Sequence, residues 1–212
     1  MQVSNAIRGF YAVLDRDDEA LARALLASGA RVLQVRIKGA RRTTAGQLVR
    51  AGRMARRICN EYGAALVIND RIDVAMAVRA DGVHLGQTDL PLAAARPLVG
   101  NRLWIGVSTH NPAQVRAACA GGADYLGFGP VFATSTKRNP DPLQGLEGLR
   151  LAVVEAGAVP VVAIGGITAD VAAAIYATGA VAICAISAVT GAADITAAGR
   201  RFSPDIARDY KV

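Results

Sequence analysis

The sequence predicts an α/β protein of the (β/α)8 TIM-barrel class, built as a single domain over residues 1–212. Three observations predict this class. Short apolar runs alternate with helical stretches, polar residues gather directly after the apolar runs, and no low-complexity linker divides the chain. Such alternation imposes parallel strands joined by right-handed crossovers, and eight units can close into a barrel. The alternative is an open doubly wound sheet, which usually has fewer units and a glycine-rich first turn. Here the first turn, Leu14-Asp15-Arg16-Asp17, contains no glycine, which favours the barrel.

Eight apolar runs are the candidate strands. Most are continuous rather than alternating, which is typical of parallel strands covered on both faces. In chain order they are Phe10–Leu14, Val32–Val35, Ala65–Ile68, Gly82–Leu85, Leu103–Val107, Tyr125–Phe128, Val159–Ile164 and Val181–Ile186.

The segments between these runs have helical character. Asn111 followed by Pro112 reads as an N-cap with a first-turn proline, and Thr168 reads as the cap of a later helix that ends before Gly179. Gly-Ala or Gly-Gly pairs before several candidate strands indicate tight helix-to-strand turns. The clearest predicted helices are Asp17–Ala27, Thr44–Tyr62, Asn111–Ala120 and Thr168–Thr178.

Composition suits a large core, because 52% of the residues are hydrophobic and 19% are charged. No run of 18 apolar residues occurs, and the first residues lack the pattern of a secretion signal, so we expect neither a membrane span nor export. Cys59, Cys119 and Cys184 fit no metal motif. We therefore expect a cytoplasmic protein with reduced cysteines.

The net charge of +7 allows two interpretations. A basic stripe could bind nucleic acid, or arginines could be scattered over solvated helix faces. Arg50, Arg53 and Arg57 have helical spacing without interleaved aromatic residues. This pattern favours a solvated helix face, and we expect no nucleic-acid partner.

The active site of a barrel lies at the carboxyl ends of its strands, so the residues after each run are the candidates. Gln34, Arg36 and Lys38 alternate and should point to one side of an extended strand. Two cations converging in a barrel need an anion, and Arg and Lys both bind phosphate. The alternative is a strand end whose cations reach solvent.

Asp70 and Asp89 follow neighbouring strands. Strands lie about 4.8 Å apart, so the two carboxylates can meet around one ion. Mg²⁺ is typically bound by one or two carboxylates with phosphate oxygens and water, so Mg²⁺ is the expected cofactor. The alternatives are a surface turn at Asp70 and a helix cap at Asp89.

A polar loop, Thr134-Ser135-Thr136-Lys137, offers hydroxyls, backbone N–H groups and one cation after the sixth run. Gly165-Gly166 and Ile186-Ser187 end the last two runs, where many barrels bind phosphate. An ordinary flexible loop is the alternative for the first of these. His84 reads as a hydrogen-bonded core histidine, and His110 as a residue near a helix start.

These strings resemble, in order, the thiamine-phosphate synthase family. The resemblance runs from about Tyr11 to Phe202. It rests on Gln34-x-Arg36-x-Lys38, Asn69-Asp70, Gly82–Gln87 with Asp89, Gly106-Val107-Ser108, Gly129–Phe132, Thr134-x-Thr136-Lys137, Ile164–Ile167 and Ile186-Ser187-Ala188.

The resemblance implies a transferase that couples a pyrimidine diphosphate with a thiazole phosphate and releases diphosphate. By the same analogy Arg36, Lys38 and Lys137 are catalytic, and Asp70 and Asp89 bind Mg²⁺. The implied pyrimidine diphosphate residues are Gln34, Val35, Arg36, Ile37, Lys38, Asn69, Ser108 and Lys137, and the implied thiazole phosphate residues are Thr134, Ser135, Thr136, Gly166, Ile186 and Ser187.

The chemistry agrees with this set. Diphosphate leaves readily once Mg²⁺ and cations neutralise it, so a dissociative substitution needs no strong base. We expect closure of the Ala133–Pro142 loop to exclude water. A thiazole tautomerase-like paralogue, a non-catalytic phosphate sensor and a nucleic-acid-binding protein stay as alternatives. The sequence leaves open whether the chain forms a homo-oligomer and whether the thiazole is carboxylated.

Overall fold

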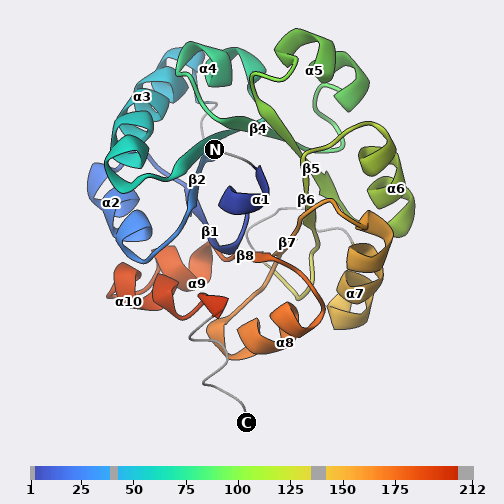
Figure 1. Ribbon diagram of the computed structural model, residues 1–212. Coiled ribbons are helices and arrows are strands. Elements are labelled where there is room, and N and C mark those ends of the chain that lie inside the picture. The colour runs from blue at the N-terminus through green and yellow to red at the C-terminus, as the bar shows by residue number, and fades with distance from the viewer. Residues whose placement is uncertain (1–2, 39–42, 135–141, 205–212) are drawn as a thin grey trace.

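The computed structural model describes residues 3–38, 43–134 and 142–204. Its eight strands pair in parallel, each with the next in sequence, and the eighth pairs with the first, so the sheet closes into a barrel (Figure 1). The predicted fold class is confirmed. The strands are β1 (Gly9–Leu14), β2 (Val32–Val35), β3 (Ala65–Asn69), β4 (Gly82–Leu85), β5 (Trp104–Thr109), β6 (Tyr125–Phe128), β7 (Val161–Ile164) and β8 (Ala182–Cys184).

Helices surround the barrel (Figure 1). They are α1 (Val3–Ala6), α2 (Glu19–Ala27), α3 (Ala45–Tyr62), α4 (Ile72–Ala77), α5 (Leu92–Val99), α6 (Pro112–Ala120), α7 (Gly145–Ala156), α8 (Ala172–Ala177), α9 (Ser187–Thr190) and α10 (Ile195–Arg200), with a 3-10 turn η1 (Ala169–Val171) before α8.

Capping residues position most of the predicted helices. The Thr44 hydroxyl accepts from the backbone N–H of Gln47 at the start of α3, and the Gln47 side chain accepts from the backbone N–H of Thr44 in return. Asn111 caps α6 as predicted, directly before Pro112. Thr168 does not act as the predicted cap: its side chain makes no capping bond, and the helix begins with the 3-10 turn η1 instead.

Side chains on the strands point alternately to the helices and to the barrel interior, as the two-residue period of a strand requires. The outward residues join the helices in one core layer, and the inward residues form a second layer along the barrel axis. The inner layer consists of Ala6, Ile7, Tyr11, Val13, Val32, Ala65, Val67, Tyr125, Val162, Ala182 and Cys184.

The short helix α1 closes the amino-terminal end of the barrel. Figure 1 shows it in front of the strands, close to the barrel axis. Ala6 and Ile7 at its end are 0% and 1% exposed and belong to the inner core layer. Within the described part of the chain, α1 therefore covers the amino-terminal end of the barrel.

Two arginine–aspartate clamps join neighbouring strands. Asp81 precedes β4, and its Oδ2 accepts from the backbone N–H of Leu66 in β3 at 2.7 Å and from Arg56 of α3 at 2.6 Å. The same arrangement recurs two strands later with Asp124, the backbone N–H of Ile105 at 2.7 Å and Arg96 of α5 at 2.6 Å. Each clamp fixes one strand pair and the helix that packs on it.

The basic face of α3 is matched by acidic residues. Arg57 pairs with Glu19 of α2 at 2.7 Å and with Glu61 of its own helix at 3.1 Å. Arg50 pairs with Asp17 at 2.8 Å. This pattern supports a solvated helix face over a nucleic-acid stripe. Among the described residues, no helix has the length and apolar character needed to cross a membrane.

Candidate active site

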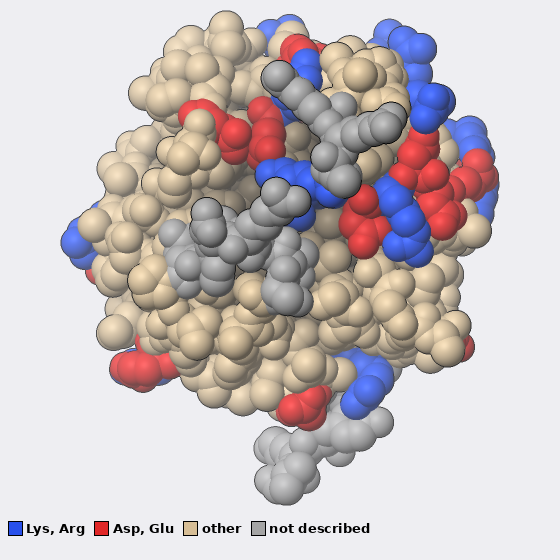
Figure 2. All heavy atoms as spheres, turned by 180° about the vertical axis from the view of Figure 1, so that it is seen from behind, with Lys and Arg blue, Asp and Glu red and all other residues tan. Residues whose placement is uncertain are grey.

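A cavity of about 390 Å³ opens at the carboxyl ends of the strands. This volume is within the range of small-molecule sites. Figure 2 views the molecule from the side opposite to Figure 1, and basic and acidic side chains gather around the middle of that face. Most residues predicted for the site line this cavity: Gln34, Arg36, Lys38, Asn69, Asp70, Asp89, Ser108, Thr134, Gly166, Ile186 and Ser187.

Cations and carboxylates meet on the side formed by β2, β3 and β4. The Lys38 ammonium lies 3.2 Å from Oδ2 of Asp70. Arg36 is half-buried, and its backbone N–H continues the pairing of β2 with β1 by donating to the Leu14 carbonyl at 2.9 Å. Within the described part of the chain, Arg36 has no carboxylate as ion-pair partner, so its charge is available to an anionic ligand.

Backbone geometry holds Asp70 at the rim. Its φ of 63° lies in the left-handed region, and its N–H donates to the His84 carbonyl at 2.8 Å. Aspartate tolerates this conformation better than most residues, although it costs some energy. The surface turn expected as the alternative is therefore tied to β4 and faces the cavity.

Asp89 does not cap the following helix. Its Oδ2 accepts from the backbone N–H of Gly86 at 2.7 Å and closes a turn upstream, whereas α5 begins at Leu92 after Pro91. The cap predicted as the alternative fails because Pro91 separates Asp89 from the helix. The carboxylate is held beside the cavity instead.

The two carboxylates suit a divalent cation. Burial raises the pKa of Asp70, the Lys38 ammonium lowers it, and the nearby Asp89 carboxylate raises it. Two carboxylates that oppose each other's ionisation are relieved by a cation between them. No group of three or more metal-ligating side chains occurs among the described residues, so further ligands of an ion here would be substrate oxygens or water.

Val35 and Ile37 lie outside the cavity lining. Val35 is 1% exposed in the core layer beneath the helices, and Ile37 packs against the same layer. They alternate with Gln34, Arg36 and Lys38, so their side chains point to the opposite face of the strand. Contact of these two residues with a ligand would have to come from their backbone.

The side formed by β6, β7 and β8 presents hydroxyls and backbone. Thr134, Gly166, Ile186 and Ser187 line it. The glycine at 166 has φ of 62°, and a Cβ there would lie 2.2 Å from the Ala133 carbonyl oxygen. Gly166 was predicted to let a ligand approach the backbone closely. In the structure the loop after β6 occupies this space, and the contact holds the loop beside the cavity.

Three predicted site residues, Ser135, Thr136 and Lys137, lie outside the described residues, as does most of the predicted Ala133–Pro142 loop. The described ends of this connection are anchored. The backbone N–H groups of Val131 and Phe132 donate to Ile164 and Gly165 at 3.0 Å each. The connection therefore starts beside the cavity.

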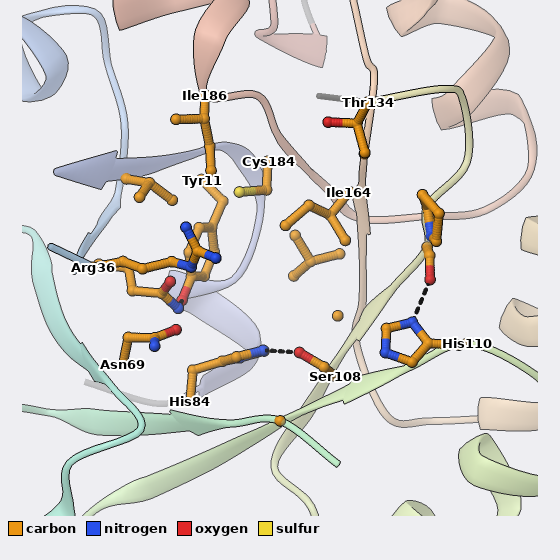
Figure 3. Close-up of a pocket in the computed structure, with 18 of the residues that line it drawn as sticks. Tyr11, Arg36, Asn69, His84, Ser108, His110, Thr134, Ile164, Cys184 and Ile186 are labelled. Carbon is orange, nitrogen blue, oxygen red and sulfur yellow. Dashed lines mark hydrogen bonds between the residues drawn. The ribbon is translucent and has the colours of Figure 1, made fainter. Parts of the chain in front are cut away.

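A chain of buried hydrogen bonds crosses the barrel below the charged rim. The Gln34 Nε2 group donates to the Tyr11 hydroxyl at 3.0 Å, and the hydroxyls of Tyr11 and Tyr125 lie 2.9 Å apart. The Tyr125 hydroxyl lies 3.0 Å from Nδ1 of His84, and Nε2 of His84 lies 2.9 Å from the Ser108 hydroxyl (Figure 3). The residues of this hydrogen-bond series come from five strands, β1, β2, β4, β5 and β6.

Burial keeps the cavity floor uncharged. Desolvation and the Arg36 charge lower the pKa of His84, Asp89 opposes them, and together they bring it to about 4. Burial raises the pKa of Tyr11 and Tyr125 well above the usual range and raises the pKa of the Cys184 thiol to about 12. A neutral floor beneath a charged rim suits a ring with an anionic tail.

Sequence reasoning missed several cavity residues. Tyr11 and Tyr125 lie within apolar runs and read as core, and only the strand alternation, which puts them inside the barrel, could have revealed them. Gln87 donates to the Ser108 carbonyl at 2.6 Å. His110 Nδ1 contacts the Gly129 carbonyl at 2.5 Å, so its predicted place near the start of α6 also puts it in the cavity wall (Figure 3).

Comparisons with known proteins agree with this geometry. A profile of the family described as thiamine monophosphate synthase matches residues 10–189. A thiamine-phosphate synthase of Moorella thermoacetica is 46% identical over 188 residues, covering 89% of this chain and 88% of the relative. One of Chloroflexus aurantiacus is 45% identical over 186 residues, covering 88% of this chain and 84% of the relative.

A solved structure extends the likeness to the whole fold. The thiamine phosphate pyrophosphorylase from Pyrococcus furiosus superposes with a TM-score of 0.86 at 36% identity. The match covers 99% of this chain and 100% of that chain.

Proposed function

The chain belongs to the thiamine monophosphate synthase family, and we propose that its cavity joins a pyrimidine diphosphate to a thiazole phosphate with release of diphosphate. The family makes the protein a transferase of thiamine biosynthesis. One observation carries the proposal for the site. Most of the described residues expected to hold the two substrates line one cavity, on the elements β2 to β5 for one substrate and β6 to β8 for the other.

The β2–β5 side would hold the diphosphate. Arg36 can bind phosphate oxygens in a bidentate manner, and Lys38 adds a mobile positive charge. Asn69 and Ser108 line the same side and supply an amide and a hydroxyl. Neutralising the leaving diphosphate lowers the barrier to breaking its bond to the pyrimidine methylene.

Asp70 and Asp89 would hold the Mg²⁺ ion, since both carboxylates line the same side of the cavity and the Asp89 carboxylate raises the pKa of Asp70. When bound, the ion would add positive charge beside the diphosphate oxygens. Lys38 pairs with Asp70 in the structure, and its ammonium would be the group that turns to the diphosphate when Asp70 holds the ion.

The β6–β8 side would hold the thiazole phosphate. Thr134 and Ser187 offer hydroxyls, and Gly166 and Ile186 shape the wall. From the resemblance, Ser135 and Thr136 would complete this site, and Lys137 would bind the pyrimidine diphosphate and complete the catalytic set. Whether the thiazole is carboxylated stays open.

The neutral floor suits a dissociative substitution. Among the described residues that line the cavity, the carboxylates are Asp70 and Asp89, both at its rim. The pyrimidine ring would lie above Tyr11, Tyr125 and His84, while the thiazole nitrogen attacks the methylene from the other side. The cytoplasm as location and a homo-oligomer as assembly stay predictions.

Product formation tests the proposal. Wild-type protein should release diphosphate and form thiamine phosphate in equal amounts, with Mg²⁺ and both substrates required. Asp70→Asn should lower kcat/KM by roughly 100-fold, because losing one charge-stabilising group at a reacting centre has effects of this order. Asp73→Asn, at an exposed ion pair with Arg71 on α4, is the matched control and should keep wild-type rates.

Two results would contradict the proposal. Folded wild-type protein that forms no thiamine phosphate would overturn the reaction, and thiazole isomerisation would then be measured. Unchanged activity of Asp70→Asn at limiting Mg²⁺ would overturn the metal site while leaving the reaction intact.

A further inference from the structure

We propose that Gln34, Tyr11, Tyr125 and His84 form a one-way series of hydrogen bonds that obliges Ser108 to donate its hydroxyl proton to the ligand. Tyr11, Tyr125 and His84 would then be positioning residues, because they act through Ser108. The inference rests on the proposed function only where it identifies the acceptor as a diphosphate oxygen. Its first half, the direction of the bonds, concerns the protein alone.

The direction follows from counting protons. The Gln34 Nε2 group donates to the Tyr11 oxygen, so the single hydroxyl proton of Tyr11 is left for the Tyr125 oxygen. The Tyr125 proton must then go to Nδ1 of His84 at 3.0 Å, the only other contact of that hydroxyl among the described residues.

The imidazole tautomer of His84 determines the direction of its hydrogen bond to Ser108. Since Nδ1 accepts, the neutral ring carries its proton on Nε2, and Nε2 donates to the Ser108 oxygen at 2.9 Å. The Ser108 hydroxyl proton has no role left in the series and points to the cavity that Ser108 lines.

Only one other order is self-consistent, and it has the opposite effect. If every bond ran in reverse, His84 would carry its proton on Nδ1, and Ser108 would donate to Nε2. Ser108 would then show only lone pairs to the cavity and would repel an anion. The Gln34 amide, whose Nε2 faces Tyr11, selects the productive order.

The barrel is built around this series. A Cβ at Gly106 would lie 2.1 Å from Cζ of Tyr125, and one at Gly127 would lie 3.1 Å from Cε1 of His84. Both positions face the barrel interior, and both lack a side chain where the two rings lie. The rings therefore have little room to turn, and the series keeps its geometry in the absence of a ligand.

Nitrogen NMR of the free protein tests the direction. The chain has two histidines, so a ¹⁵N-histidine sample gives two ring patterns. His84 should show a protonated Nε2. His110 should show a protonated Nδ1, because this atom must donate to the Gly129 carbonyl. A His84→Asn spectrum assigns the signals, and a protonated Nδ1 on His84 in the wild type would overturn the proposal.

Kinetics test the consequence. Tyr125→Phe removes the donor to Nδ1, so both tautomers of His84 become populated and Ser108 no longer has to donate. We expect kcat to fall roughly 10- to 100-fold, the loss typical of one hydrogen bond to a charged group, with KM for the thiazole phosphate unchanged. Tyr176→Phe removes a comparable hydroxyl, which donates to the Phe202 carbonyl outside the cavity, and should behave as wild type.

A double variant separates positioning from general damage to the fold. If Tyr125 acts through Ser108, adding Tyr125→Phe to Ser108→Ala should lower kcat no further than Ser108→Ala alone. Additive losses would overturn the positioning role. The NMR result stays decisive even if wild-type protein makes no thiamine phosphate, so failure of the reaction and failure of the hydrogen-bond direction are distinguishable.

Discussion

At the scale of single residues, the cavity floor combines polar atoms with burial that is complete at Tyr125 and partial at His84 and Ser108. Tyr125 is 0% exposed, yet its hydroxyl has partners on two sides, Tyr11 and His84. A buried hydroxyl without partners would be costly, whereas one inside a satisfied network adds specificity. The floor can therefore orient a polar ring without charge of its own.

The same burial predicts low reactivity of two thiols. Burial raises the pKa of Cys59 and of Cys184 to about 12, and only the thiolate is nucleophilic. In native protein treated with iodoacetamide at pH 8, half-buried Cys119 should be labelled first, and Cys59 and Cys184 only after unfolding. Peptide mass spectrometry would show this. Cys184 labelling as fast as Cys119 would contradict it.

These thiols also predict the direction of a pH effect. Their folded pKa lies above the ordinary value of 9.0, so the unfolded chain loses these protons first. Their contribution to stability is complete below pH 9 and is lost as the pH rises from 9 toward 12. A Cys59→Ser variant should show a smaller decrease in the free energy of unfolding over this range.

At the scale of elements, the arginine–aspartate clamps hold adjacent strands in register. Asp81 binds a strand N–H and a helix arginine through one oxygen, and Asp124 does the same two strands later. Both aspartates directly precede a strand, at the end of the barrel away from the cavity. Their effect should therefore fall on stability rather than on catalysis.

Loss of one clamp tests this division. Asp81→Asn should lower the free energy of unfolding by about 1–3 kcal/mol, because Arg56 loses its charged partner in a partly buried position. The Nε of Arg56 is already buried without a hydrogen-bond partner among the described residues, so the guanidinium has no ready substitute. Urea unfolding measures the change.

Glu147→Gln is the control for this clamp. It breaks a surface pair with Arg150 whose side chains are 67% and 54% exposed, and it should change stability by less than about 0.5 kcal/mol. Equal losses for the two variants would show that burial of the ion pair does not matter.

At the scale of the whole molecule, strand order and the polar mouth could be predicted from the sequence. Continuous apolar runs identify parallel strands, and the barrel then brings the residues after each run together. The β2 to β4 boundaries agree to within one residue. In contrast, β7 is shorter than predicted at its start and β8 at both ends, because the apolar runs extend beyond the paired residues.

Other features had no local signal. The four-residue helix α1 is too short for a helical period, and its role depends on the far end of the barrel. Tyr11 and Tyr125 are 114 residues apart and meet only after β1 and β6 share one barrel. Val35 and Ile37 were included in the predicted site with their alternating neighbours, although strand geometry turns their side chains away.

Closure of the amino-terminal end predicts a purely structural effect. Ile7→Ala should lower the free energy of unfolding by about 2–5 kcal/mol, because Ile7 is fully buried in the inner layer. The value of kcat should stay close to wild type. Val154→Ala, at a position 70% exposed, is the control and should shift stability by less than about 0.5 kcal/mol. A large loss of kcat in Ile7→Ala would show that the two ends of the barrel are coupled.

Among the described residues, α1 also covers the end of the barrel away from the cavity, whose lining residues lie along the strands and at their carboxyl ends. A ligand that reaches the floor near Tyr125 passes the rim, which includes Arg36, Lys38, Asp70 and Asp89. A ligand bound at the rim would therefore cover the path to the cavity floor. Both substrates would therefore enter, and both products would leave, at the carboxyl ends of the strands.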